Sequence, residues 1–200
     1  MDKYILITGA SGLLGKALVR QFTANGFHVF GQYREKAPQG PKNCEWLQAD
    51  FSTLTGIQDF LVENSLRLKR CNFLINNYGP ITYKDIADLT ADDFYFDFHH
   101  NVITAFEITN FFIKYTHLQS VVNIGFEAVG VIKPYKKILT YAVAKNALQL
   151  MTESFAANYP NIRFQMISPS TLIGAKVKQR TGEQISPQVV AQEVFDKITT

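Results

Sequence analysis

Charged residues are scarce in this chain: Asp, Glu, Lys and Arg make up 18% of its 200 residues, whereas 46% are hydrophobic. This balance excludes a disordered or low-complexity chain, because such chains carry too few apolar residues to build a core. Long hydrophobic runs are missing as well, and none approaches the ~20 residues that a membrane-spanning helix needs. Cysteine is nearly absent. Cys44 and Cys71 lack metal-ligand spacing, so we expect reduced structural thiols in a cytoplasmic protein.

An excess of one charge is also lacking. Twenty basic residues against seventeen acidic ones leave a net charge of +3, too small to favour nucleic acid or a membrane surface as a partner. The first apolar run starts almost at Met1 and leaves no room for a signal peptide. With 200 residues and no linker-like stretch, the chain is predicted to form a single domain over residues 1–200.

Short apolar runs alternate with longer amphipathic stretches along the whole chain. The runs predict strands at residues 4–7, 28–33, 45–47, 73–75, 121–124 and 162–167, and the stretches predict helices at 12–24, 57–66, 92–115, 141–158 and 188–198. This alternation indicates a doubly wound α/β fold, in which helices cover both faces of a parallel sheet. Such sheets bind ligands beyond the C-terminal ends of their strands, so we look for function in those loops.

A glycine-rich turn joins the first strand to the first helix. Gly9 permits a tight turn, Gly12 lets the backbone approach a pyrophosphate, and Gly15 lets the helix pack closely on the strand. The N-terminus of that helix offers free N–H groups and the positive end of its dipole to phosphates. This placement predicts a dinucleotide-binding domain with the Rossmann fold.

The end of the second strand indicates which dinucleotide is bound. An acidic residue there holds the ribose hydroxyls of NAD, whereas an arginine accommodates the 2′-phosphate of NADP. The chain has Tyr33 and Arg34 at this place, followed by Glu35, which is able to pair with Arg34 instead. The charge of Arg34 favours NADP over NAD.

Further motifs follow the later strands in order. Asp50 comes after the third strand, Asn76–Gly79 after the fourth, Asn101 lies in the long helix, and Tyr141 and Lys145 form a Tyr-x-x-x-Lys motif after the fifth. Together with the glycine turn, they resemble the short-chain dehydrogenase/reductase family over essentially the whole chain. The resemblance implies an NAD(P)H-dependent oxidoreductase of the short subtype. Its expected substrate is a carbonyl, an alcohol or a pterin, as in ketoreductases and pteridine reductases.

The pairing of Tyr141 with Lys145 has a physical reason. Residues four apart on a helix point to the same face, and a neighbouring ammonium stabilises tyrosinate, which lowers the tyrosine pKa from about 10 towards neutral pH. The resemblance implies that Tyr141 protonates the carbonyl oxygen as hydride arrives from the nicotinamide. It also implies that Lys145 holds the nicotinamide ribose, and that Asn101 interrupts its helix locally and supports a proton-relay water.

The resemblance further implies cofactor contacts from several loops. They are expected to line the pyrophosphate turn, to bracket the adenine, to pass beneath the adenosine ribose and to face the nicotinamide. The expected cofactor residues are Gly9, Ser11, Gly12, Leu14, Tyr33, Arg34, Asp50, Phe51, Asn77, Tyr78, Gly79, Ile124, Tyr141, Lys145, Pro169, Thr171 and Leu172. No metal site is expected.

Two positions depart from the family pattern. The family's usual serine after the fifth strand falls on Phe126, which cannot donate a hydrogen bond to a substrate carbonyl. Glu127 is the nearest polar candidate for that role, and the alternative is an exposed loop carboxylate. Tyr78 stands where the family usually has alanine. Together with Phe126, it favours a flat, conjugated substrate that stacks on rings.

The same substitution motivates a second hypothesis, a dinucleotide-binding sensor or scaffold with little or no catalysis. After the sixth strand, Lys176, Lys178 and Arg180 form a basic loop that in this family closes over the substrate, so either an anionic substrate or a merely solvated loop is expected. A homodimer or homotetramer through the helices at 92–115 and 141–158 is expected from the family. Its members usually continue into a seventh strand, for which these 200 residues show no candidate. We therefore expect the sixth strand to be an edge, unless the sequence is shortened or a partner subunit or another element covers it.

Overall fold

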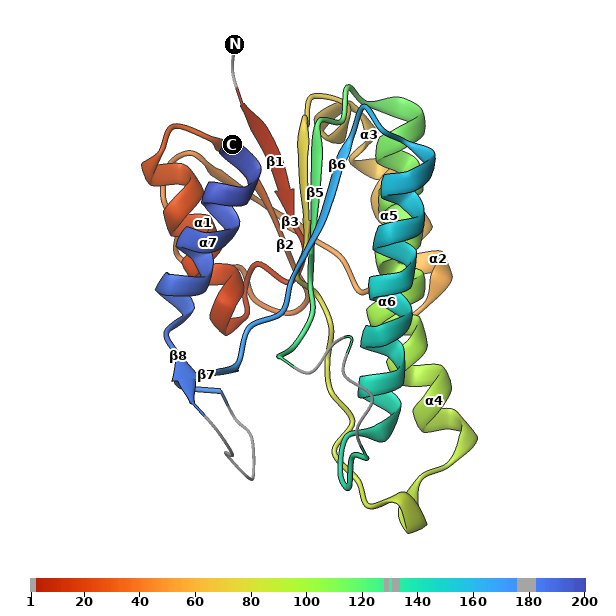
Figure 1. The fold of residues 1–200 in the computed structure, drawn as a ribbon. Coiled ribbons are helices and arrows are strands. Elements are labelled where there is room, and N and C mark those ends of the chain that lie inside the picture. The colour runs from red at the N-terminus through yellow and green to blue at the C-terminus, as the bar shows by residue number, and fades with distance from the viewer. Residues whose placement is uncertain (1–2, 128–129, 131–133, 176–182) are drawn as a thin grey trace.

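The computed structural model describes residues 3–127, 130, 134–175 and 183–200. Its centre is a six-stranded parallel sheet in the order β3-β2-β1-β4-β5-β6, which confirms the doubly wound α/β fold (Figure 1). The order reverses between β1 and β4, the point where such sheets bind ligands. The strands are β1 (Tyr4–Ile7), β2 (His28–Tyr33), β3 (Cys44–Gln48), β4 (Phe73–Asn76), β5 (Ser120–Ile124) and β6 (Arg163–Ile167).

Helices cover both faces of this sheet, as Figure 1 shows. On one face lie α1 (Leu13–Ala24) and α7 (Pro187–Thr199), whose apolar sides meet β1 and β5 around Phe22 and Val194. The other face carries α2 (Leu54–Glu63), α3 (Ser65–Leu68), α4 (Ala91–Phe98), α5 (Thr104–Tyr115) and α6 (Leu139–Asn158). Their core centres on Phe60, Ile108 and Phe112. Burial on both faces explains why the strands are continuous apolar runs.

The helix predicted at residues 92–115 is not one regular helix. A π-helical turn, His99–Ile103, separates α4 from α5, so the predicted local interruption at Asn101 is present. The Asn101 Nδ2 donates to the carbonyl oxygen of Asp97 at 2.9 Å and to that of Pro80 at 3.1 Å. This side chain therefore ties the turn to the loop that follows β4.

Other boundaries shift by a few residues for local reasons. The helix predicted at 57–66 begins at Leu54, because the Thr53 hydroxyl accepts from the Gly56 N–H at 3.0 Å and caps its N-terminus. It ends at Glu63, and after Asn64 the short α3 follows. Two short strands that the sequence did not indicate, β7 (Thr171–Leu172) and β8 (Gln184–Ile185), pair in parallel beside α7, and residues 86–88 form a 3₁₀ turn.

β6 forms one edge of the sheet, and the described residues supply no seventh strand beside it. Within those residues, none of the helices has the length and apolar character required to span a bilayer.

Candidate active site

The glycine turn after β1 is held by backbone geometry and by one buried amide. Gly9 has φ +61°, and a Cβ there would lie 3.0 Å from the Tyr78 Cα, so both conformation and space require glycine. The Gly9 N–H donates to Gln32 Oε1 at 2.8 Å, and Gln32 Nε2 donates to the Ala49 carbonyl at 2.8 Å. Gln32 is buried in β2. It fixes the turn, and the sequence patterns did not single it out.

The start of α1 is open to an anion. Gly12 is its N-cap, no side chain caps it, and its first turn holds no acidic residue. The helix's own first turn therefore supplies no carboxylate to the orphan N–H groups or to the positive end of the helix dipole. A Cβ on Gly15 would lie 2.6 Å from the Ala10 Cα, which shows how closely α1 packs on the turn. This cradle fits a pyrophosphate.

The loop after β4 is bound to the same turn. The Thr8 hydroxyl accepts from the backbone N–H groups of Asn77 and Tyr78, each at 3.0 Å. The Asn77 amide donates to the Thr8 and Gly9 carbonyls at 3.0 and 3.1 Å. Two segments predicted to contact the cofactor, though far apart in sequence, are thus joined at the point where the strand order reverses.

The adenine end of the predicted site has features that the sequence did not reveal. The Phe51 ring is buried against Phe60 and Tyr78, so only its backbone is available to bracket an adenine. Burial raises the pKa of the half-buried Tyr78 to about 12, with Asp50 adding to the rise and Arg34 opposing it. Its phenol therefore stays neutral at physiological pH.

Arg34 is on the surface and forms an ion pair with Glu35 at 2.5 Å, the alternative that the sequence left open. The same Glu35 raises the pKa of the Arg34 guanidinium. Because exposed ion pairs contribute little to stability, this pair leaves the guanidinium available to another anion.

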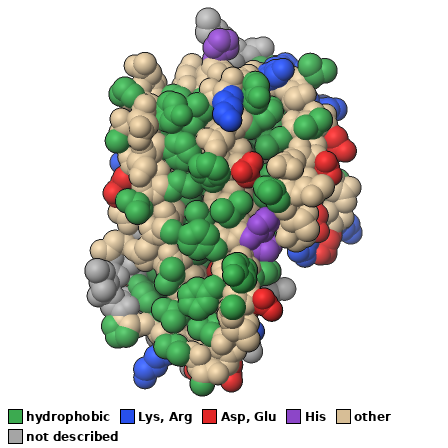
Figure 2. Space-filling view, turned by 90° about the vertical axis from the view of Figure 1, so that its right-hand side faces the viewer, with side chains coloured by type: hydrophobic (Ala, Val, Ile, Leu, Met, Phe, Trp, Pro, Cys, Tyr) green, Lys and Arg blue, Asp and Glu red, His purple; other side chains and the backbone are tan. Residues whose placement is uncertain are grey.

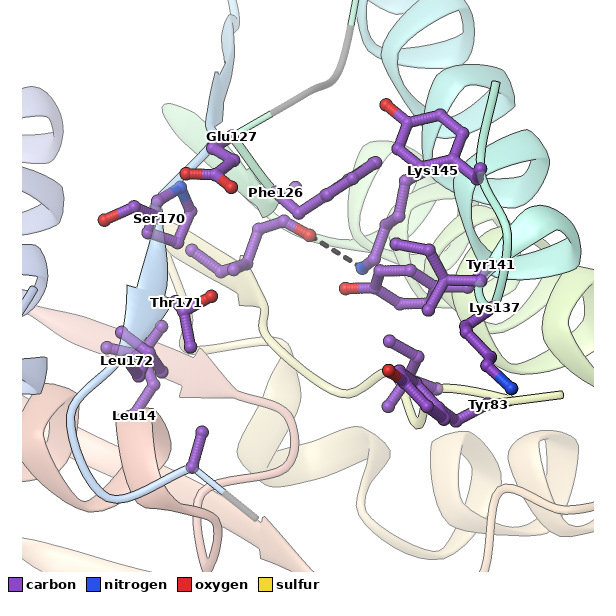
Figure 3. Close-up of a pocket in the computed structure, with 18 of the residues that line it drawn as sticks. Leu14, Tyr83, Phe126, Glu127, Lys137, Tyr141, Lys145, Ser170, Thr171 and Leu172 are labelled. Carbon is purple, nitrogen blue, oxygen red and sulfur yellow. Dashed lines mark hydrogen bonds between the residues drawn. The ribbon is translucent and has the colours of Figure 1, made fainter. Parts of the chain in front are cut away.

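Tyr141 and Lys145 lie on the first turns of α6 and share one face of that helix, as their spacing predicts. Lys145 is buried, its Nζ donates to the Ile124 carbonyl at 2.7 Å, and it lies 5.6 Å from the centre of the Tyr141 ring. Figure 3 shows both side chains directed into the same space, across from Thr171 and Leu172. The two groups are therefore close enough to influence each other's charge.

The pKa directions of this pair differ from the sequence-based expectation. Burial raises the pKa of Tyr141 above its ordinary value, and the charge of Asp97 adds to the rise. Burial lowers the pKa of Lys145 to about 7, while Asp97 opposes that change. The Tyr141 pKa is thus raised where the sequence predicted a lowering by Lys145, because burial, which the sequence does not display, is the largest cause.

Asn101 approaches the same pair from the π-helical turn. Its Oδ1 is buried and has no hydrogen-bond partner among the described residues. A Cβ at Gly79 would overlap this oxygen and would lie 3.1 Å from Lys145 Nζ. Glycine at position 79 therefore leaves room for both side chains, and an unpaired acceptor and the Lys145 Nζ both face this position.

Gly79, Tyr141 and Lys145 border a cavity of about 630 Å³. Its apolar and backbone walls come from the ends of β5 and β6, from the start of α1 and from the loop that precedes α6 (Figure 3). Of the predicted site residues, it is lined by Leu14, Asn77, Gly79, Ile124, Phe126, Glu127, Tyr141, Lys145, Pro169, Thr171 and Leu172. The remaining predicted residues lie outside this lining.

Aromatic rings form much of the wall near Tyr141. The Phe126 ring lies 5.5 Å from that of Tyr141 and 5.9 Å from that of Tyr135, and Tyr83 also lines the cavity. Glu127 is exposed, and its backbone N–H donates to the Pro169 carbonyl at 2.9 Å. Tyr83 and Tyr135 were missed in the sequence, because neither stands in a recognisable motif.

The basic segment with Lys176, Lys178 and Arg180 lies outside the described residues.

Comparison with known proteins agrees with this geometry. The family model for short chain dehydrogenases matches residues 3–185. Senescence-associated protein 13 of Arabidopsis thaliana is 27% identical over 82% of this chain and 66% of that protein. The uncharacterized oxidoreductase YvrD of Bacillus subtilis (strain 168) is 28% identical over 78% of this chain and 62% of that protein. The chain thus spans about two thirds of the length of these relatives.

Among solved structures, a short chain dehydrogenase from Leptospira borgpetersenii with bound NAD⁺ superimposes with a TM-score of 0.86. It is 22% identical, and the match covers 100% of this chain and 87% of that one. At this identity the likeness concerns the fold. Because the family model spans nearly the whole chain, from the glycine turn past the Tyr-x-x-x-Lys pair, the chain belongs to the short-chain dehydrogenase family.

Proposed function

We propose that this chain is an NAD(P)H-dependent oxidoreductase that transfers hydride to or from a carbonyl, alcohol or pterin-like substrate. The observation that carries the proposal is the convergence of Tyr141, Lys145 and Asn101 beside one cavity that also reaches the start of α1. The bound NAD⁺ in the Leptospira relative supports a nicotinamide dinucleotide as cofactor.

The residues present fit such a cofactor. The uncapped start of α1 suits a pyrophosphate, and the loop Asn77–Gly79 is held beside it by Thr8. Ile124 beside Lys145, and Thr171 and Leu172 across from it, line the part of the cavity where the nicotinamide is expected. When bound, the nicotinamide supplies or accepts the hydride. Arg34, at the end of β2, supports NADP rather than NAD, because its guanidinium suits a 2′-phosphate.

The protein's own part in the reaction is proton transfer. Burial holds Tyr141 in its neutral form, so in the reducing direction its phenol is ready to donate a proton to the carbonyl oxygen. A protonated Lys145 beside it stabilises the tyrosinate that this step leaves. The Ile124 carbonyl orients the Lys145 ammonium, and the unpaired Asn101 Oδ1 leaves an acceptor on the same side of Gly79.

Phe126 occupies the position of the family's serine in this proposal. Loss of one such donor costs about 10²–10³ in rate, which slows catalysis without abolishing it. The rings of Tyr83, Phe126 and Tyr135 around the cavity favour a flat, conjugated substrate, since such substrates stack on aromatic faces.

The test is turnover of a panel of carbonyl and pterin compounds with NADPH, comparing the wild type with Tyr141→Phe. We expect the variant to lose about 10²–10⁴ of kcat, because a positioned acid contributes that much, while its NADPH affinity is kept. Tyr159→Phe, at the far end of α6, is the matched control and keeps full activity. Unchanged turnover in Tyr141→Phe contradicts the assigned role.

A second candidate is a dinucleotide-dependent sensor or scaffold. The observation that favours it is the Phe126 ring, which packs beside Tyr141 where the family has a hydrogen-bond donor. Tight NADPH binding without turnover of any compound in the panel selects this candidate over the enzyme.

A further inference from the structure

α4 carries a fully buried carboxylate that none of the sequence motifs includes. The Asp97 side chain has no solvent exposure, although its helix neighbours Phe96 and Phe98 are exposed. Burying a carboxylate is costly unless its oxygens accept hydrogen bonds or it meets an opposite charge. Its surroundings therefore indicate what the charge does.

Each oxygen of Asp97 accepts from a different part of the candidate site. Oδ2 accepts from the Thr140 hydroxyl at 2.5 Å, and Thr140 immediately precedes Tyr141 on α6. Oδ1 accepts from the Thr82 N–H at 3.2 Å, between the cavity-lining residues Ile81 and Tyr83. Asp97 thus connects the start of α6 with the loop that borders the cavity.

The backbone of Asp97 adds a third connection. Its carbonyl oxygen accepts from Asn101 Nδ2 at 2.9 Å, which orients the amide whose Oδ1 lies near Lys145. Through one residue on α4, Asn101 and the helix turn that carries Tyr141 are therefore held together.

The charge of Asp97 acts on the same groups. In the part of the chain that the structure describes, no lysine or arginine forms an ion pair with it. Among the described residues, the titratable groups whose pKa its charge raises include Lys145 and Tyr141 from α6 and His100 from the π-helical turn. Of these, Lys145 is buried and carries a positive charge when protonated, and the charge of Asp97 opposes the lowering of its pKa by burial.

We propose that Asp97 is a positioning residue of the active site, which aligns Tyr141 and Asn101 through its hydrogen bonds and whose negative charge favours the protonated form of Lys145. The inference rests on the proposed function, because alignment matters only if these groups transfer protons. It adds a buried acid on α4 to the Asn, Tyr and Lys groups.

The direction of the effect follows from the sign of the charge. Removing a negative charge lowers the pKa of both Lys145 and Tyr141, since each then holds its proton less tightly. In the reducing direction both groups must be protonated. Activity in an Asp97→Asn variant is therefore lost at lower pH than in the wild type.

The experiment compares wild type, Asp97→Asn, Thr140→Val and Thr140→Ser in kcat against pH with NADPH and the best substrate of the panel. Asp97→Asn is expected to move the alkaline limb down by about one pH unit. Thr140→Val keeps the charge of Asp97 but removes its hydrogen bond to α6, so kcat is expected to fall about tenfold while the alkaline limb of the pH profile stays in place. Thr140→Ser keeps a hydroxyl and is expected to retain the wild-type kcat. Asp92→Asn, an exposed acid on the same helix, is the control for a change of net charge and leaves the profile unchanged.

A second measurement does not depend on turnover. The Lys145 pKa is read from its ¹³Cε shift in lysine-labelled protein, with Lys145→Met to identify the signal. The Lys145 pKa should fall by about one unit in Asp97→Asn and remain at its wild-type value in Thr140→Val. If no compound is turned over but this shift appears, the proposed function fails and the electrostatic role of Asp97 stands. An unmoved Lys145 pKa in folded Asp97→Asn overturns the inference. If Asp97→Asn does not fold, an unchanged kcat in Thr140→Val overturns the inference instead.

Discussion

At the scale of single residues, Arg34 shows how a surface ion pair can leave a binding role open. Its partner Glu35 is on the same strand end, and both side chains are more than half exposed. Water screens such a pair, so exchanging Glu35 for a phosphate costs little. A phosphate offers more oxygens and more charge than a carboxylate, which makes it the stronger partner for a guanidinium.

Arg34→Ala therefore tests the choice of cofactor. We expect its Kd for NADPH to rise by about 10–100-fold, since a charge-assisted pair is lost, while its Kd for NADH stays within about twofold. Glu35→Ala, which removes the competing carboxylate, serves as the matched variant and binds NADPH at least as tightly as the wild type. Titration of protein fluorescence gives both constants, and tighter wild-type binding of NADH than of NADPH contradicts the assignment.

The residues that the sequence predicts well are those whose spacing carries the chemistry. Tyr141 and Lys145 lie together because four positions make one helical turn, and that holds wherever the helix lies. Asp97 and Gln32 were not predicted, because their partners are 15 to 43 positions away and are brought close only by the fold. The pKa of Tyr141 was expected in the wrong direction for the same reason, since burial is a property of the packed molecule.

At the scale of elements, the turn from β1 into α1 combines conformation with close packing. Gly15 has an ordinary φ, yet a Cβ there meets backbone atoms of the turn, including the Ala10 Cα at 2.6 Å. Backbone atoms in a closely packed turn cannot move aside as a flexible side chain can. The third glycine is thus required by packing, whereas Gly9 is required by φ as well.

Gly15→Ala is accordingly expected to lower the free energy of unfolding by about 1–3 kcal/mol and to weaken NADPH binding, because the displaced turn forms the phosphate cradle. Gly26→Ala is the matched control: its φ is +82° but no atom lies within 4 Å of the added Cβ. It should cost about 1 kcal/mol through conformation alone and leave binding unchanged. Urea unfolding and NADPH titration measure the two effects. Equal loss of affinity in both variants contradicts the packing argument.

The elements themselves were predictable in type and order, because their apolar periodicity reflects burial on one or both faces. The residues at which the elements begin and end were less predictable. α2 begins at Leu54 because of one hydroxyl cap, and the turn at His99–Ile103 depends on contacts of Asn101 with a distant loop. β7 and β8 consist of two residues each, which is too short for any periodic signal.

At the scale of the whole molecule, one face remains unusually apolar. Figure 2 shows hydrophobic side chains gathered along the face formed by α4, α5 and α6. Exposed large hydrophobic residues on these helices include Phe94, Tyr95, Phe98, Phe106, Val143 and Leu150. Contiguous exposed apolar surface of this kind usually marks an interface. We therefore propose that the homodimer or homotetramer expected from the family forms through this face.

Leu150→Asp tests that assembly, since Leu150 is 67% exposed on α6 and its replacement places a charge in the proposed contact. We expect light scattering after size-exclusion chromatography to give twice or four times the mass of one chain for the wild type. For the variant we expect a smaller assembly, because burying an unpaired carboxylate costs several kcal/mol. Val189, 56% exposed on α7 across the sheet, provides the control: Val189→Asp introduces the same charge outside this face and should leave the assembly intact.

A wild type that stays monomeric at all concentrations contradicts the proposal, as does an equal effect of the two variants. Loss of assembly with retained NADPH binding in Leu150→Asp would place the whole proposed dinucleotide site within one chain.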